Sequence, residues 1–281
     1  MTDTIIIDGL RADTLYGLRV LKGSFSGLVA YPPRKPVKSN DWNERDGVEA
    51  DLMTPAFDGK KLQMRLFCMG AGSARRFIDF MNTKAGKHTF SFGLTGERSF
   101  ALRLTGISNL DYWQNGNAEM TLNLSEDAPA LPYDITPAYL VGDNGNTEWV
   151  TLSGRGLTEY GVHVLKGTLA SLLEKSELKE GLLSSSKYAD GRLYHGTSTH
   201  FKAKDVQVEC LLTAETASGF WAKYDTLLHD LIAPGELLLS FPSIGKSYKA
   251  YYKECSTVDI DISRRLWWQF RLTFTLTDYR P

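Results

Sequence analysis

Cysteine is scarce in this 281-residue sequence, which contains only Cys68, Cys210 and Cys255. The number is odd, and the spacing between them does not match a metal-binding or disulfide framework. Cys68 and Cys210 lie in runs where apolar and polar residues alternate, and a free cysteine packs there as a small apolar side chain. We therefore expect a protein made in a reducing compartment, without structural disulfides.

Neither sign of charge is in excess, and long apolar runs are missing. The 32 basic and 33 acidic residues give a net charge of −1, with 16 of each up to Leu140 and 16 and 17 after it. A polycationic surface that grips nucleic acid phosphates is therefore not expected. No run of about 18 apolar residues predicts a membrane span, and the N-terminal MTDTIIIDGLRADT lacks the basic segment of a secretory signal.

What the sequence does contain is an internal repeat. YGLRVLKGS (16–24) recurs as YGVHVLKGT (160–168), an offset of 144 residues. At this offset Asp46-Gly47 aligns with Asp190-Gly191, and residues 14–63 show 14 identities in 50 positions, against roughly 6% expected from composition. Further along, an offset of about 152 would align MTLNL (120–124) with LTFTL (272–276). The repeat predicts a first domain at 1–130, a proline-rich linker at 131–146 and a second domain at 147–281.

Both copies predict the same succession of elements. Each has a short strand, a second strand at the repeated block, a long polar loop (about 32–55 and 176–199), an alternating strand (61–68 and 205–212), one helix and three closing strands. Apolar residues at helical spacing predict that each helix packs on a sheet. These are Ala74, Phe77, Ile78 and Met81 in the first copy, and Phe220, Tyr224, Leu227, Leu228 and Leu231 in the second. Five or six strands and one helix per domain favour a mainly β (α+β) fold, with a sandwich or barrel and a flanking helix.

Patterns that could carry chemistry are weak. The turn GAGSARRF (70–77) could cradle a phosphate, but Arg75 stands where a dinucleotide site needs its third glycine, and the aligned turn of the second copy has no glycine. His195 and His200 could bind a metal, but their counterparts are Asp51 and Ala56. His88 has no evident partner, and Trp267 is left as a possible surface aromatic. We expect no catalytic, cofactor-binding or metal-binding residues, and no enzymatic activity.

One segment resembles a known family. The stretch PPRKP…DWNERDGVEADLMTPAFDGKKLQMRLFC (32–68) resembles the N-terminal region of phage distal tail proteins and related tail-tube proteins. The motif in that family is a basic, proline-containing stretch, an "(R)DG-x-E-x-DL" turn, a proline and a long alternating strand. It corresponds here to Arg45, Asp46, Gly47, Glu49, Asp51, Leu52 and Pro55, followed by 61–68. The second copy keeps Asp190-Gly191 but has Leu193, His195 and Thr199 in place of Glu49, Asp51 and Pro55.

The resemblance implies two tandem tail-tube-like β-sandwich or split-barrel domains. It also implies a structural component of a phage or prophage tail (distal tail, tube or baseplate hub), made in the bacterial cytoplasm and located in the virion tail. The protein would form a ring with itself, as a trimer of two-domain chains or as a hexamer, and would contact other tail proteins. DNA would pass through the lumen without sequence-specific binding.

The polar loops are longer and more polar than simple connections need to be, so we assign them to contacts with neighbouring subunits or with the next ring. The residues assigned to them are Arg45, Asp46, Gly47, Glu49 and Asp51 in the first copy and Asp190, Gly191 and Arg192 in the second. The alternative function is a tandem carbohydrate-binding or adhesion module, because β-sandwiches with exposed aromatic residues often bind glycans.

Overall fold

The strands of the chain form two seven-stranded antiparallel sheets, one in each half of the sequence. The computed structural model describes residues 4–84, 86–96, 98–141, 149–174, 176–181, 183–188, 190–194, 199–261 and 266–280. The strand order is β2-β1-β7-β8-β9-β6-β3 in the first sheet and β11-β10-β16-β17-β18-β15-β12 in the second. Each strand of the first sheet thus has a counterpart at the same place in the second. The mainly β, two-sheet fold predicted from the sequence is confirmed.

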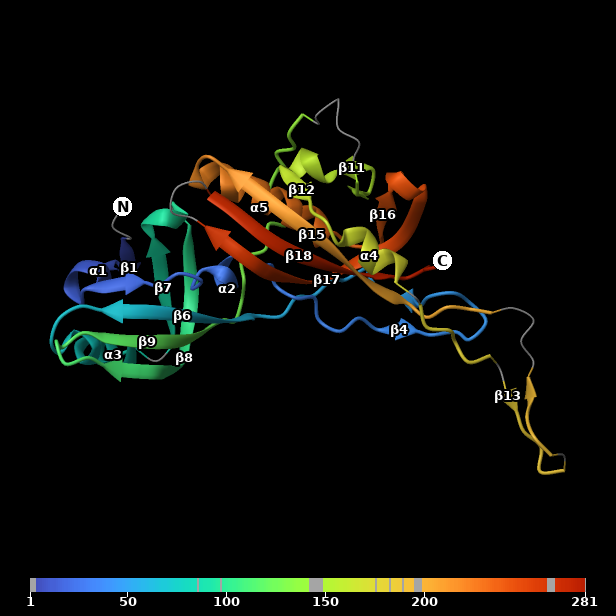
Figure 1. Ribbon diagram of the computed structural model, residues 1–281, viewed down its shortest axis with the longest axis horizontal. Helices are drawn as coiled ribbons and strands as arrows, with labels where there is room; N and C mark the ends of the chain where they lie inside the picture. The colour runs from blue at the N-terminus through green and yellow to red at the C-terminus, as the bar shows by residue number, and fades with distance from the viewer. Residues whose placement is uncertain are drawn as a thin grey trace.

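The first sheet occupies the left of Figure 1. Its strands are β1 (Ile5–Ile7), β2 (Leu10–Arg11), β3 (Leu18–Val20), β6 (Lys60–Cys68), β7 (Lys87–Phe92), β8 (Ser99–Tyr112) and β9 (Ala118–Glu126). Register shifts near Gly106 and between Ser108 and Asp111 mark bulges in β8. Bulges bend a strand, and in Figure 1 β7 runs across the direction of β6 and β9, so that the sheet curves over its own core.

The second sheet lies at the centre and right of Figure 1. It contains β10 (Thr151–Leu152), β11 (Arg155–Gly156), β12 (Val162–Val164), β15 (Lys204–Ala214), β16 (Leu237–Phe241), β17 (Lys246–Asp261) and β18 (Leu266–Leu276). Two separate hairpins lie in the long polar loops: β4 (Ser39–Asn40) with β5 (Glu49–Ala50), and β13 (Leu183–Ser184) with β14 (Leu193–Tyr194). The sequence had assigned these loops no strands.

Strand pairing gives the register of the repeat directly. Leu18 pairs with Cys68 in the first sheet and Val162 with Leu212 in the second, which is an offset of 144 on both strands. For the last strand, Met64 pairs with Leu122 and Val208 with Leu272, so the offset there is 150. The predicted offset of 152 is therefore wrong by two residues. A slip of two leaves the same residues facing the core, so alternation cannot detect it.

The long helices pack as their apolar stripes predict. Helices α3 (Ser73–Asn82) and α5 (Ala217–Leu231) bury Phe77, Met81, Phe220, Tyr224 and Leu227, whereas Ile78 is half-buried. Shorter helices that the sequence did not predict are α1 (Ala12–Leu15), α2 (Ser26–Val29) and α4 (Thr168–Leu173), with 3₁₀ turns η1 (Gly93–Thr95), η2 (Leu157–Tyr160) and η3 (Pro242–Ile244). Four to six residues are too few to show a helical period. Among the described residues, no helix is long and apolar enough to cross a membrane.

The two halves are joined by buried contacts as well as by the chain. Tyr31, which follows α2 and is 1% exposed, packs against Tyr224, Trp268 and Phe270 of the second half and donates a hydrogen bond to the Tyr224 carbonyl at 3.0 Å. Arg98 of the first half pairs with Asp225 at 2.9 Å. The described part of the predicted linker, 131–141, contains neither helix nor strand. Its Tyr139 hydroxyl hydrogen-bonds to Asp230 of α5 at 3.0 Å, so the linker lies on the second domain.

Candidate assembly interface

The polar loop of the first half lies against the second half of the same chain, and three hydrogen bonds join its turn to Phe201 and Thr277 there. Gly47 N donates to Phe201 O at 2.8 Å, and Val48 N donates to Thr277 O at 2.9 Å. In return, Phe201 N donates to Asp46 Oδ1 at 2.9 Å. The Asp-Gly pair singled out by the repeat therefore docks on the main chain of the second half, through the Asp46 carboxylate and the Gly47 amide.

Gly47 is required by the closeness of this contact. Its φ is +68°, which is costly for other residues, and a Cβ placed on it would lie 1.7 Å from the Thr277 carbonyl oxygen. The residue is buried. No side chain can therefore replace glycine without moving the loop away from the end of β18.

Lys179 fixes the same turn from the other side. Its side chain is 2% exposed, and its ammonium group donates to the carbonyls of Trp42 at 2.9 Å and Gly47 at 2.5 Å and forms an ion pair with Asp41. A buried ammonium group is tolerated only when its hydrogen bonds are made. Lys179 was not predicted from the sequence, although it is identical with Lys35 at the 144-residue offset of the repeat.

The other loop residues assigned from the sequence shape the loop itself. Glu49 Oε2 accepts a hydrogen bond from Trp42 Nε1 at 3.0 Å, and Asp51 Oδ1 accepts one from Met53 N at 3.4 Å. Arg45 is exposed, and its amide donates to Trp42 O at 3.3 Å. Glu49, Asp51 and Arg45 therefore hold the hairpin that presents Asp46 and Gly47. An intersubunit role for them stays a prediction.

The second half carries the equivalent hairpin in a different setting. Strands β13 and β14 lie 144 residues after β4 and β5, and they pair in the same register: Leu183 with Tyr194, as Ser39 with Ala50. Figure 1 shows this hairpin projecting away from both sheets at the lower right. Asp190, Gly191 and Arg192 are all exposed in it. From the sequence, both loops were assigned to contacts with neighbouring subunits or with the next ring. Asp46 and Gly47 of the first loop instead bind the second half of the same chain. An intersubunit contact of Asp190, Gly191 and Arg192 stays a prediction.

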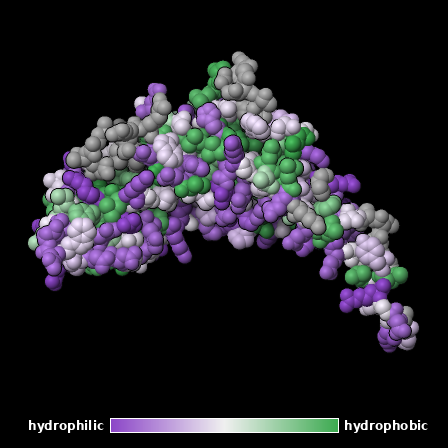
Figure 2. All heavy atoms as spheres, in the orientation of Figure 1, coloured by the Kyte–Doolittle hydropathy of each residue, from purple (hydrophilic) through white to green (hydrophobic). Residues whose placement is uncertain are grey.

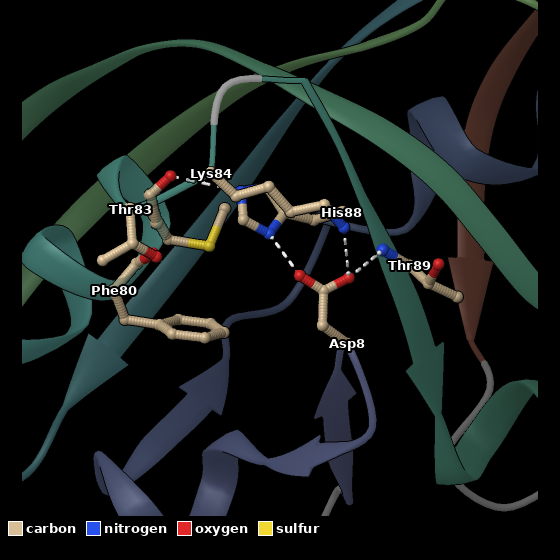
Figure 3. Close-up of polar contacts among 7 residues, drawn as sticks. Asp8, Phe80, Thr83, Lys84, His88 and Thr89 are labelled. Atoms are coloured by element: carbon tan, nitrogen blue, oxygen red, sulfur yellow. Dashed lines mark hydrogen bonds and ion pairs between the residues drawn. The ribbon is translucent and has the colours of Figure 1, made fainter.

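A buried polar cluster in the first half was also missed, because His88 was expected to have no partner. Its Nδ1 lies 2.7 Å from Asp8 Oδ2 and its Nε2 lies 3.1 Å from Met81 O (Figure 3). Asp8 Oδ1 accepts hydrogen bonds from Thr89 N at 2.8 Å and Lys84 Nζ at 3.3 Å. Burial works against ionisation of Asp8, but the hydrogen bonds outweigh it and hold the pKa of that carboxyl below its ordinary value.

This cluster has a structural role. His88 is 1% exposed, and both ring nitrogens are engaged by the protein. Asp8 and Ser153 occupy equivalent positions in the two halves, because both have a positive φ (50° and 49°) and both side chains accept a hydrogen bond from the neighbouring strand. The donors are Thr89 N and Leu238 N. Leu237, which precedes Leu238, is therefore the counterpart of His88 in the second half. The Asp8–His88 contact joins the turn after β1 to β7.

The remaining sequence candidates show no shared site. His200 Nδ1 lies 3.5 Å from Asp46 Oδ1, and His195 lies outside the described residues. Trp267 is half-buried in β18. The turn before α3 places Gly70 and Gly72 at positive φ, as a tight turn requires. In the described part of the chain, no group of three or more His, Cys, Asp or Glu residues could hold a metal ion.

Comparisons with known proteins find little that is close. No family model and no curated protein matches the chain. One solved structure that matches is described as the SPP1 Dit protein, "a paradigm of hub adsorption apparatus in Gram-positive infecting phages". It shares 11% identity over 98% of this chain and 99% of that chain, with a TM-score of 0.33. A likeness this distant carries no argument about function.

Proposed function

We propose that this protein is a structural component of a phage or prophage tail, acting as a distal tail, tube or baseplate-hub protein. In this role it assembles with itself and with other tail proteins into a ring around the DNA channel. DNA passes through without sequence-specific contacts, which agrees with the net charge of −1. The protein acts by assembly and carries out no catalytic step.

One observation carries the proposal. The segment that resembles the tail family, 32–68, contains the turn at Asp46-Gly47 that docks one sheet domain onto the other. A motif that joins two copies of a domain side by side is what a ring of such domains needs. The two sheets have the same strand order, so the chain already contains one such junction.

The number of domains agrees with a ring of six. Three chains of two domains give six units, and a contact that joins one surface to a different surface of the next unit closes a ring when the rotation between units permits. A hexamer of chains would instead give twelve domains, in one ring or two. The trimer is therefore the assembly we favour.

The experiment is imaging of the purified protein by negative-stain electron microscopy, with its mass measured by native mass spectrometry. Rings with an open centre, of three or six chains, would support the proposal, as would incorporation of the tagged chain into tails in an infected or induced host. A protein that stays monomeric, is absent from purified tails and binds glycans on an array would refute it in favour of an adhesion module.

A further inference from the structure

The docking surface used within the chain has a counterpart in the first half. Phe201 pairs with Leu178 in an antiparallel β-bridge. The hydrogen bonds of this bridge are made by the flanking residues, from Lys179 N to His200 O and from Lys202 N to Glu177 O. The amide and carbonyl of Phe201 therefore point away from Leu178, to the side where Asp46 and Gly47 bind them.

Phe57 has the same arrangement without an occupant. It is bridged to Arg34 through Lys35 N to Ala56 O at 2.9 Å and Asp58 N to Pro33 O at 2.9 Å. Its own amide and carbonyl therefore also point outward. Among the residues that the structure describes, no hydrogen bond engages either group. An outward N–H and C=O pair of this kind is a template for another chain segment.

The rest of the surface is repeated too. Lys35 stands at the position of Lys179, and Asp127 directly follows β9 as Thr277 directly follows β18. Lys35 is half-exposed and lies 3.8 Å from Asp58, a looser pairing than that of the buried Lys179. The first half thus has the same surface as the second half, but only the surface of the second half is covered by a loop of this chain.

The segment that would fill it is the β13–β14 hairpin. Its turn repeats Asp46-Gly47-Val48 as Asp190-Gly191-Arg192, and these residues are exposed. The hairpin also exposes large apolar side chains, among them Tyr188 at 85% and Leu193 at 62%. In Figure 2, hydrophobic (green) and hydrophilic (purple) residues lie side by side on the projecting arm. Exposed apolar groups of this kind mark a surface that a partner covers.

We propose that residues 190–192 of one chain dock on Phe57 and Asp127 of a second copy, repeating between chains the contact made within the chain. Gly191 N donates to Phe57 O, Phe57 N donates to the Asp190 carboxylate, and Arg192 N donates to Asp127 O. Figure 1 places the hairpin and the first sheet at opposite ends of the molecule, so the acceptor belongs to another copy.

Charge is compatible with this pairing. The contact within the chain joins Val48 to Thr277, whereas the contact between chains joins Arg192 to Asp127, whose carboxylate already forms an ion pair with Arg103 at 2.8 Å. Asp127 is held ionised by hydrogen bonds from Arg103 and Ser125, which lower its pKa. The joint is heterologous and closes into a ring when its rotation permits. This inference rests on the proposed function, because it names the partner and the contact residues of the same ring.

The first test compares glycine variants of the full chain by sedimentation velocity over a range of concentrations. A methyl group on Gly47 would collide with the Thr277 carbonyl oxygen, so Gly191→Ala should collide with the equivalent carbonyl of the second copy. Within its own chain, a Cβ on Gly191 would have no atom within 4 Å. Gly154→Ala is the matched control, with φ +87° against +85° and equally open space. We expect Gly191→Ala to weaken self-association by about 10- to 100-fold, because main-chain hydrogen bonds are lost. Gly154→Ala should associate as the wild type does.

The second test is disulfide trapping between two variants that each carry one added cysteine, Asp127→Cys and Arg192→Cys. We expect a covalent dimer when the two are mixed and oxidised, and none from either variant or the wild type alone, whose cysteines are buried or half-buried. Rings that form without this cross-link and are unaffected by Gly191→Ala would overturn the inference and leave the proposed function standing. Cross-linked open chains that never close would support the inference and refute the ring. A chain that neither associates nor cross-links at its highest soluble concentration would overturn the inference.

Discussion

Tyr31 is the side chain through which we expect the two domains to be most strongly coupled. It comes from the first half, is 1% exposed and is enclosed by Tyr224, Trp268 and Phe270 at ring-centre distances of 4.5, 5.2 and 6.2 Å. Truncating it to alanine removes the ring from this pocket and leaves a cavity between α5 and β18. The free energy of unfolding of the chain should fall accordingly.

The size of the effect follows from two contributions. A buried aromatic side chain covers about 150–250 Å² of surface, which at about 25 cal/mol per Å² corresponds to about 4–6 kcal/mol. Measured truncations of buried aromatic residues cost about 3–5 kcal/mol. The hydroxyl adds one hydrogen bond, to Tyr224 O at 3.0 Å, worth about 1 kcal/mol. We therefore expect Tyr31→Ala to cost about 4 kcal/mol and Tyr31→Phe about 1 kcal/mol, because ring burial dominates.

The assay is urea unfolding followed by circular dichroism, with Tyr112→Ala as the control because Tyr112 is 59% exposed. Tyr31→Ala should also separate the transition into two, since the halves lose a shared core residue. If Tyr31→Ala and Tyr112→Ala cost the same, or if Tyr31→Phe costs as much as Tyr31→Ala, the reasoning about this interface is wrong.

Three further predictions concern the first domain. Phe77→Ala should cost about 3–5 kcal/mol in urea unfolding, because Phe77 is fully buried under α3, and a loss well under about 1 kcal/mol would contradict this placement. The hydrogen bond from Arg11 lowers the pKa of Asp13 to about 2 from 3.8, so Asp13 stabilises the fold above about pH 4 and loses this effect as the pH falls towards 2. Stability measured from pH 6 to 2 should therefore fall less steeply in Asp13→Asn, and an equal slope would refute the assignment. Asp8→Ala should cost about 1–3 kcal/mol, because it leaves buried His88 without its carboxylate partner, and an unchanged melting curve would contradict this role.

Local patterns in the sequence were sufficient for the long strands and the two long helices that face a core. Alternation predicted β6 and β15, and helical spacing predicted the buried faces of α3 and α5, because one-sided burial imposes a period of 2 or 3.6 on the residues concerned. The repeat gave the offset of 144, which strand pairing confirms for β3 and β6 against β12 and β15. Asp46, Gly47, Asp190 and Gly191 were also found from the repeat.

Contacts between distant segments were decided only in the tertiary structure. Asp8 and His88 are 80 residues apart, and Lys179 meets Gly47 across 132 residues, so no local pattern could join them. The two-residue error in the last strand has a related cause, since alternation fixes the face of a residue but only cross-strand pairing fixes its register.

The sequence by itself determined that two like domains follow each other and that each polar loop carries an Asp-Gly turn. It could not determine that one turn is buried against Phe201 and Thr277 while the other is exposed. The two loops are alike in composition, and they differ in whether another part of the chain lies against their Asp-Gly turn. The first loop has a domain of the same chain within reach, whereas the second projects from the end of the molecule.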